Sequence, residues 1–184
     1  MTLSIGGNDA RFSKVLQHCM LVAVPWCEES RFDSDADSLS VAEPALIQGP
    51  VFDNIVLALN AIHNAAPNAR ILLMGYPRLL TNNGFCLPGI ASPEGSWLNE
   101  MGDKLDETIE RAANFVRRPD YPVIFGDPRP DFGDHGACAL SGGLIHDIVV
   151  GTTRGEGALS QQSLHPTALG ALVYSATATK ALAR

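Results

Sequence analysis

The stretch that decides the predicted fold is Ile71-Leu72-Leu73-Met74, which is closed by Gly75-Tyr76-Pro77. Successive side chains of a strand point to opposite faces, so four apolar residues in a row make both faces apolar. A strand of this kind is covered on both sides, which is typical of a parallel sheet. The glycine and the proline then end the strand in a turn.

The segments on either side of this strand have the periodicity of helices. Apolar residues recur at three- and four-residue steps over residues 51–63 and over residues 98–116, which predicts an amphipathic helix in each. Two more short strands are predicted, at residues 2–5 and 123–125, and each runs into a glycine turn. Strands that alternate with helices indicate an α/β fold, with a parallel sheet and right-handed crossovers.

The rest of the chain divides into two further helices and three loops. With 184 residues there is room for one domain, predicted over residues 1–184. Three visible strands make a thin sheet, because sheets usually have about four to six. Helices are predicted at residues 11–18 and 166–183, and loops at residues 28–50, 79–96 and 129–164.

The composition excludes several classes of protein. Thirteen basic and 20 acidic residues give a net charge of −7, so the chain has little with which to neutralise phosphates, and no nucleic-acid partner is expected. The longest apolar stretch, residues 19–26, contains a proline, whereas a bilayer-spanning helix needs about 20 apolar residues. No transmembrane segment is therefore expected. Nor is a signal peptide expected in this chain, because Met1 is followed at once by a strand-like run.

Four cysteines, Cys19, Cys27, Cys86 and Cys138, allow three disulfide pairings, and their positions alone do not choose among them. No Cys-x-x-Cys occurs, so zinc binding or redox chemistry is not expected. Cys19 and Cys27 bracket a short apolar segment, which suits a local disulfide. Disulfides would indicate an oxidising compartment, and free thiols in a reducing cytosol are the alternative.

Asn8 follows the first predicted strand directly, next to Gly6 and Gly7. Ligand sites of open α/β sheets collect at the carboxyl ends of the strands, and glycines allow a ligand to approach the backbone. The Asn8 amide can donate a hydrogen bond to a developing oxyanion, which needs a fixed, uncharged donor. The alternative is that Asn8, or more readily Asp9, caps the helix that follows.

His165 precedes Pro166 at the start of the last predicted helix. A histidine held by a proline turn at the strand ends can serve as a general base. The alternative is a histidine that is merely exposed to water at a helix start.

Other motifs lack residues that their chemistry requires. Residues 33–37 begin like a calcium loop, but Ser38 and Pro44 stand where that loop needs a glycine and a bidentate glutamate. A solvated acidic loop is therefore expected. The sequence has no His-x-x-x-His pair, no Gly-x-Ser-x-Gly and no phosphate-binding loop, so neither a metal nor a cofactor is expected.

The sequence motifs around Asn8 and His165 both resemble conserved blocks of one enzyme family. Residues 3–9, Leu-Ser-Ile-Gly-Gly-Asn-Asp, resemble block III of the SGNH (GDSL-type) ester hydrolases. His165-Pro166, with Gly170 after it, resembles block V of that family, and residues 75–77 look like the end of the strand that follows block III. The resemblance covers nearly the whole chain, and it is closest to the disulfide-containing lipase and esterase branch common among secreted bacterial members.

The resemblance implies a three-layer α/β/α sandwich of flavodoxin type, with Asn8 as an oxyanion donor and Gly6 and Gly7 at the rim of the pocket. It also implies that His165 is the general base. The family often has an aspartate three residues before this histidine, where this chain has Gln162. A glutamine cannot stabilise an imidazolium as a carboxylate does, so the carbonyl of Ser163 is expected to orient the ring instead.

The chain departs from the family at its start. The nucleophilic serine of block I, the glycine of block II and their strands precede block III in the family, and this chain begins at block III. The expectation is an N-terminally truncated domain, or one completed by a missing N-terminal segment or a second chain. If the chain were active alone, Ser4 and Ser141 would be the first serines to test as nucleophiles.

The function implied by the resemblance is hydrolysis of carboxylic esters, of lipids or small acyl esters, through a serine acyl-enzyme. The chain alone is expected to be inactive. The alternative is a non-catalytic binding module, or a module that completes a partner chain. The family branch also implies Cys19–Cys27 and Cys86–Cys138 disulfides and a secreted or extracytoplasmic protein.

Overall fold

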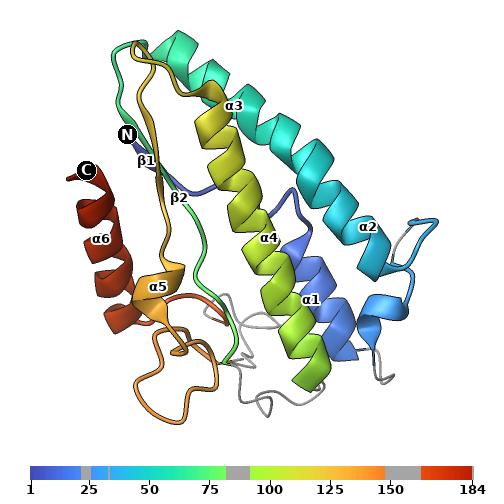
Figure 1. Cartoon of the computed structure of the whole chain (residues 1–184). Helices are drawn as coiled ribbons and strands as arrows, with labels where there is room; N and C mark the ends of the chain where they lie inside the picture. The colour runs from blue at the N-terminus through green and yellow to red at the C-terminus, as the bar shows by residue number, and fades with distance from the viewer. Residues whose placement is uncertain (22–25, 33, 82–91, 148–162, 184) are drawn as a thin grey trace, which may run out of the picture.

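The computed structural model describes residues 1–21, 26–32, 34–81, 92–147 and 163–183 (Figure 1). In chain order the helices and strands are β1 (Thr2–Leu3), α1 (Phe12–Leu21), the 3-10 turn η1 (Cys27–Glu29), α2 (Leu39–Leu46), the π turn η2 (Ile47–Val51), α3 (Phe52–Ala65), β2 (Ile71–Met74), α4 (Ser92–Val116), β3 (Val123–Gly126), α5 (Arg129–Phe132) and α6 (Ala168–Leu182).

The three predicted strands form one parallel sheet in the order β1-β2-β3. Leu73 is the partner of Leu3 on one side and of Phe125 on the other. β2 is therefore central among the described strands, as its apolar sequence predicts. Because the strands are parallel, their carboxyl ends lie at one edge of the sheet.

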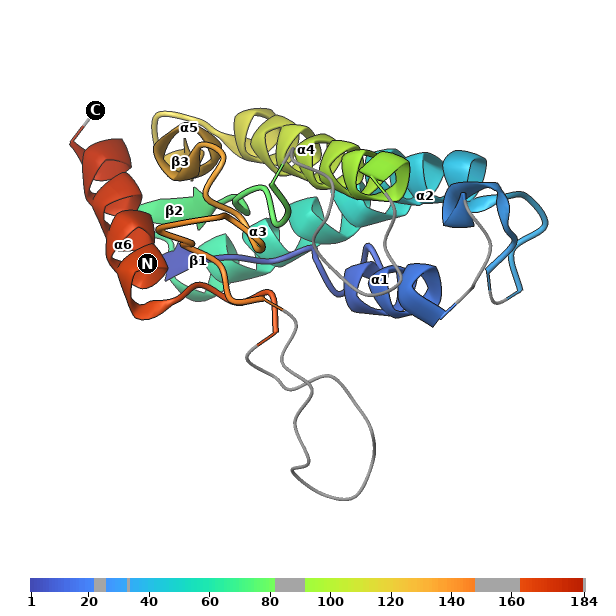
Figure 2. The same ribbon diagram turned by 90° about the horizontal axis from the view of Figure 1, so that it is seen from below.

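Helices cover both faces of the sheet, and this confirms the predicted three-layer α/β/α arrangement. Ile71 and Leu73 pack in one core with α3 and α4, while Leu72 and Met74 pack in another with Ala181 of α6. Figure 2 shows α6 on one side of the strands and α3 and α4 on the other. All four side chains of β2 are buried, which explains the unbroken apolar run.

The prediction of a loop over residues 28–50 is wrong for residues 39–50, because α2 and η2 lead directly into α3. Pro44 and Pro50 lie inside this helical run and conceal its periodicity in the sequence. A proline lacks the N–H that an α-helix uses, and at Pro50 the helix widens into a π turn. Buried side chains recur every four residues along the run: Leu39, Glu43, Ile47, Val51, Ile55 and Leu59.

The same helical run bears on the expectation that the chain has no transmembrane segment. Residues Leu39–Ala65 are long and apolar enough to cross a membrane by length and composition, the one such helix among the described residues. This is a weak indication by itself, since core helices pass the same criterion. The buried side of the run packs against α4 and the sheet in the main core.

Two further predicted loops are partly helical, and the helix predicted over residues 98–116 starts earlier than expected. α5 occupies part of the predicted loop at residues 129–164, and α4 begins at Ser92 inside the predicted loop at residues 79–96. α6 starts at Ala168, and the side chain of Thr167 caps it by accepting a hydrogen bond from the Gly170 N–H. Pro166 therefore precedes the cap instead of lying in the first turn.

One predicted disulfide lies within the described residues. Cys19 at the end of α1 is bonded to Cys27 of η1, and both side chains are fully buried. Free thiols at these two positions are therefore excluded. Cys138 is also disulfide-bonded, whereas Cys86, its predicted partner, lies outside the described residues, so that pairing stays a prediction.

Candidate active site

An open cleft lies at the carboxyl ends of β1 and β2. Its volume is about 1050 Å³, at the upper end of the roughly 300–1,000 Å³ typical of small-molecule sites. Asn8 and His165, which come from opposite ends of the chain, both line it. Other residues at the cleft include Ser4, Gly6, Tyr76 and Tyr174.

A tight turn presents Asn8 to this cleft. Gly6 has φ 107°, a left-handed conformation that favours glycine, and a Cβ there would lie 3.2 Å from the Ile55 side chain. The Ala10 N–H donates to the Gly6 carbonyl at 2.8 Å, and the Arg11 N–H donates to the Asn8 carbonyl at 3.0 Å. These bonds fix the backbone of the turn, and Asn8 itself is exposed.

The geometry does not support the alternative that Asn8 or Asp9 caps the next helix. α1 begins at Phe12, and the carbonyl that accepts its first helical bond, from the Val15 N–H at 3.0 Å, belongs to Arg11. Arg11 therefore holds the N-cap position. The Asp9 carboxylate instead accepts a hydrogen bond from the Asn54 side chain at 3.1 Å.

A partly buried cluster of ion pairs ties the end of this turn to α2. Arg11, with φ 51°, donates to both oxygens of Asp35 at 3.0 and 2.9 Å and to Glu43 at 2.8 Å. Burial raises the pKa of Glu43, an effect that the hydrogen bond from Arg11 opposes. Asp35 is thus an ion-pair partner, which corrects the expectation of a wholly solvated acidic loop.

His165 is held by a strained turn. Its Nδ1 lies 3.1 Å from the Ser163 carbonyl oxygen, and Leu164 between them is buried at φ 59°. A carbonyl can only accept a hydrogen bond, so in the neutral ring Nδ1 carries the hydrogen and Nε2 carries the lone pair, as a general base requires. The backbone of His146 bonds to both Leu164 and His165, at 3.1 and 2.8 Å. Gln162 lies outside the described residues.

The start of α6 is fastened to the same segment. The Thr167 N–H donates to the Leu144 carbonyl at 2.8 Å. A Cβ on Gly170 would lie only 1.9 Å from that carbonyl oxygen. Glycine therefore allows α6 to approach the backbone next to the histidine turn.

Ser4 lines the cleft but lacks a base among the described residues. Its hydroxyl donates to the Met74 carbonyl at 3.2 Å, and the Tyr174 hydroxyl lies 3.5 Å away. Burial raises the pKa of Tyr174 to about 12, so the phenol stays protonated at neutral pH and cannot accept the serine proton. Ser141 is not among the described residues that line the cleft.

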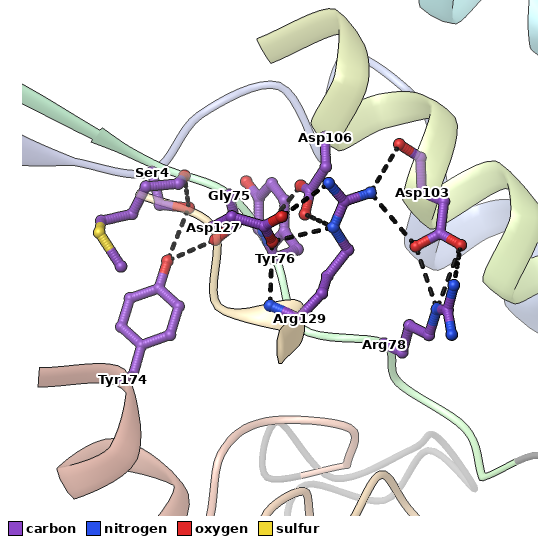
Figure 3. Close-up of polar contacts among 10 residues, drawn as sticks. Ser4, Gly75, Tyr76, Arg78, Asp103, Asp106, Asp127, Arg129 and Tyr174 are labelled. Carbon is purple, nitrogen blue, oxygen red and sulfur yellow. Dashed lines mark hydrogen bonds and ion pairs between the residues drawn. The ribbon is translucent and has the colours of Figure 1, made fainter. Parts of the chain in front are cut away.

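A network of charges lies behind the Gly75–Tyr76 segment (Figure 3). The fully buried Asp106 accepts a hydrogen bond from the Tyr76 N–H at 2.8 Å and lies 3.4 Å from Arg129 Nε. Arg129 also pairs with Asp127 at 2.8 Å. Burial raises the pKa of Asp106 to about 8, and the Tyr76 N–H and the Arg129 charge partly oppose this shift.

Sequence reasoning missed Tyr76, Asp106 and Tyr174. In the sequence, Tyr76 stands out only as part of a Gly-Tyr-Pro turn. In the structure its hydroxyl accepts a hydrogen bond from the Gly7 N–H, so it links the segments that follow β2 and β1. Asp106 offered a signal, since it stands one turn from Gly102 and beside Leu105 on the inward side of a helix. A carboxylate in that position must be paired or must change its pKa.

One cluster among the described residues has the spacing of metal ligands. Single ligand atoms of Cys27, Glu28 and Glu94 lie within 4.8 Å of one another. The Cys27 sulfur is committed to the disulfide, and the Cys27 N–H already donates to Glu94 at 3.1 Å. These contacts do not fit a metal centre.

Comparison with known proteins links the chain to bacterial lipases. It is 28% identical over 173 residues to Lipase 1 of Streptomyces coelicolor (strain ATCC BAA-471 / A3(2) / M145) and 28% identical over 171 residues to a lipase of Streptomyces rimosus. Each match covers 92% of this chain and 55% of the relative, so the chain spans about half the length of the curated relatives it matches. No family model matches the sequence.

Two solved structures share the fold. Phospholipase A1 of Streptomyces albidoflavus NA297 superposes with a TM-score of 0.74, at 24% identity over 97% of this chain and 66% of that one. The extracellular lipase of Streptomyces rimosus gives a TM-score of 0.72, at 24% identity over 98% of this chain and 68% of that one. The chain is therefore similar in sequence to Streptomyces lipases and has the α/β fold of these two structures.

Proposed function

We propose that the chain forms the oxyanion and general-base half of a lipolytic carboxylic-ester hydrolase of the SGNH (GDSL) type. The cleft carries the proposal, because Asn8 and His165 reach it from opposite ends of the chain. A serine ester hydrolase needs both a donor for the oxyanion and a base for the serine. The relationship to lipases supports acyl esters, including lipids, as the substrate class.

In the proposed reaction a serine hydroxyl attacks the ester carbonyl carbon while Nε2 of His165 takes its proton. The Asn8 amide donates a hydrogen bond to the oxyanion. The imidazolium then gives its proton to the leaving alcohol, and an acyl-enzyme remains. Water, activated by the same histidine, releases the acid and restores the serine.

The serine in this proposal comes from outside residues 1–184, from another segment or a second chain. The sequence contains no Gly-Asp-Ser, and the Ser4 hydroxyl donates to the Met74 carbonyl instead of to a base. The 184-residue chain alone should therefore hydrolyse p-nitrophenyl esters only at background rate. We also place the protein outside the cytoplasm, because the Cys19–Cys27 disulfide persists in oxidising compartments.

Hydrolysis of p-nitrophenyl esters by the chain extended with the residues encoded directly upstream of Met1 tests these roles. Asn8→Ala should lower kcat by roughly 10²–10³, the usual loss for one oxyanion donor. His165→Ala should remove nearly all turnover, because the serine then has no base. Gln162→Ala serves as the matched control and should keep most of the activity.

Two results would contradict the assignment. Turnover that survives His165→Ala, or a Gln162→Ala variant as damaged as His165→Ala, would remove the histidine from its role. An Asn8→Ala variant with full turnover and a lower Tm would make Asn8 a structural residue.

A further inference from the structure

Three parts of the molecule contact Gly75 and Tyr76, directly after β2, and Figure 3 shows two of these contacts, those of Asp106 and Tyr174. The turn that carries Asn8, the helix that follows His165 and the buried Asp106 each make a hydrogen bond to this segment. None of these three hydrogen bonds takes part in a chemical step of the proposed reaction.

The first contact joins Tyr76 to the Asn8 turn. The Gly7 N–H donates to the Tyr76 hydroxyl oxygen at 3.3 Å. A Cβ on Gly7 would lie 3.2 Å from that oxygen, so a glycine allows the phenol to approach the backbone. The Gly7 N–H belongs to the Gly6–Gly7 peptide, and this bond therefore fixes the backbone one residue before Asn8.

The second contact joins the same segment to α6. The Tyr174 hydroxyl donates to the Gly75 carbonyl at 2.7 Å. α6 begins just after His165 and is fastened to the histidine turn through Thr167. The Tyr76 side chain therefore contacts the turn that carries Asn8, and the neighbouring Gly75 carbonyl contacts the helix that follows His165.

The third contact keeps this segment in place. Asp106 accepts from the Tyr76 N–H at 2.8 Å, and a Cβ on Gly75 would lie 2.8 Å from the Asp106 carboxylate oxygens. Asp106 is fully buried, and its second oxygen lies 3.4 Å from Arg129 Nε. A fully buried side chain on the long helix α4 that bonds to the Tyr76 N–H gives the segment a rigid support.

We propose that Tyr76 is a positioning residue, whose hydroxyl holds the Asn8 turn in place relative to the helix that follows His165. The proposal rests on the proposed function, because the distance between Asn8 and His165 affects catalysis only if they act as oxyanion donor and general base. Oxyanion stabilisation depends on donors placed to a fraction of an ångström. Loss of the Tyr76 hydroxyl should therefore lower kcat and leave KM nearly unchanged.

Tyr76→Phe tests the contact, with Tyr121→Phe as the matched control. Tyr121 is a buried tyrosine outside the cleft whose hydroxyl also bonds to the backbone, at the Leu59 carbonyl. Amide hydrogen exchange by NMR reports on the Gly7 N–H directly in the 184-residue chain. Tyr76→Phe should speed exchange at Gly7 by about tenfold, because that N–H loses its acceptor, and Tyr121→Phe should leave it unchanged.

Ester hydrolysis by the upstream-extended protein supplies the functional readout. Tyr76→Phe should lower kcat by about tenfold with KM within about twofold, and Tyr121→Phe should lower Tm without this loss of kcat. Unchanged exchange at Gly7 in Tyr76→Phe, or an equal loss of kcat in the control, would overturn the proposal. A wild-type protein without hydrolysis would refute the proposed function, while the exchange experiment would still decide whether the contact holds the turn.

Discussion

Gly170 carries no side chain because the Leu144 carbonyl occupies the space in which a Cβ would lie. Gly170→Ala should push α6 away from the backbone beside His165. Overpacking of this kind costs about 1–3 kcal/mol in the free energy of unfolding. Urea unfolding followed by circular dichroism measures the loss.

Gly102→Ala is the matched control for this substitution. Gly102 lies within α4, and a Cβ there would meet nothing within 4 Å. Alanine is the better helix former, so this variant should be more stable by about 0.5–1 kcal/mol. Equal stabilities of the two variants would contradict the close approach at Gly170.

Asp106 predicts a pH dependence of stability. Its pKa in the folded chain is about 8, above the ordinary value of 3.8, so between these values the folded state holds a proton that the unfolded state has lost. The free energy of unfolding should therefore fall as the pH rises from about 4 to about 8. Asp106→Asn keeps an acceptor for the Tyr76 N–H and removes this titration.

Tm measured at pH 5 and pH 8 for both proteins checks this expectation. The Tm of the wild type should fall more over this interval than that of Asp106→Asn. The neighbouring charges on Arg129, Asp127 and Asp103 are common to both proteins, so their contribution largely cancels. Identical slopes would show that Asp106 is ionised throughout and that Arg129 outweighs its burial.

Short motifs identified some residues of the site, and long-range contacts placed the others. Asn8 and His165 each stand in a local pattern of glycine or proline, and both line the cleft. Tyr76, Asp106 and Tyr174 meet only after the sheet and α6 have assembled. Contacts between residues so far apart in the sequence leave no local pattern, so the sequence does not predict them.

Among the elements, the strands were easier to predict than the helices that contain prolines. Val123–Gly126 and Ile71–Met74 are short apolar runs between turn residues, and both are strands as expected. The helix at Leu39–Leu46 was missed because Pro44 and the polar residues before it suggested a loop. The one feature of this segment that indicates a helix is the four-residue spacing of its buried positions, such as Leu39, Glu43 and Ile47.

The Cys19–Cys27 disulfide links α1 to η1, and it is predicted to stabilise this corner of the molecule. It closes a short loop with a sequence separation of 8 residues. Loops of this size imply a stabilisation of about 2–3 kcal/mol, through restriction of the unfolded chain. The double variant Cys19→Ala/Cys27→Ala should lose that amount in urea unfolding, and an unchanged midpoint would contradict the bond's contribution.

At the scale of the whole molecule, the parallel sheet brings the two ends of the chain to one cleft. β1 precedes the Asn8 turn, and α6 packs on β2 after the His165 turn. The alternation of strands and helices predicted this layering, because parallel strands place their carboxyl ends at one edge. The sequence could not predict how closely the two turns approach, because that depends on side-chain packing between the layers.

Active-site labelling with a fluorophosphonate, followed by peptide mass spectrometry, tests the central claim most directly. The 184-residue chain should remain unlabelled. The upstream-extended protein should carry the label on one serine outside residues 1–184, and His165→Ala should abolish that labelling because the serine loses its base. A label on Ser4, Ser141 or any other serine of this chain, or labelling that persists in His165→Ala, would contradict the account.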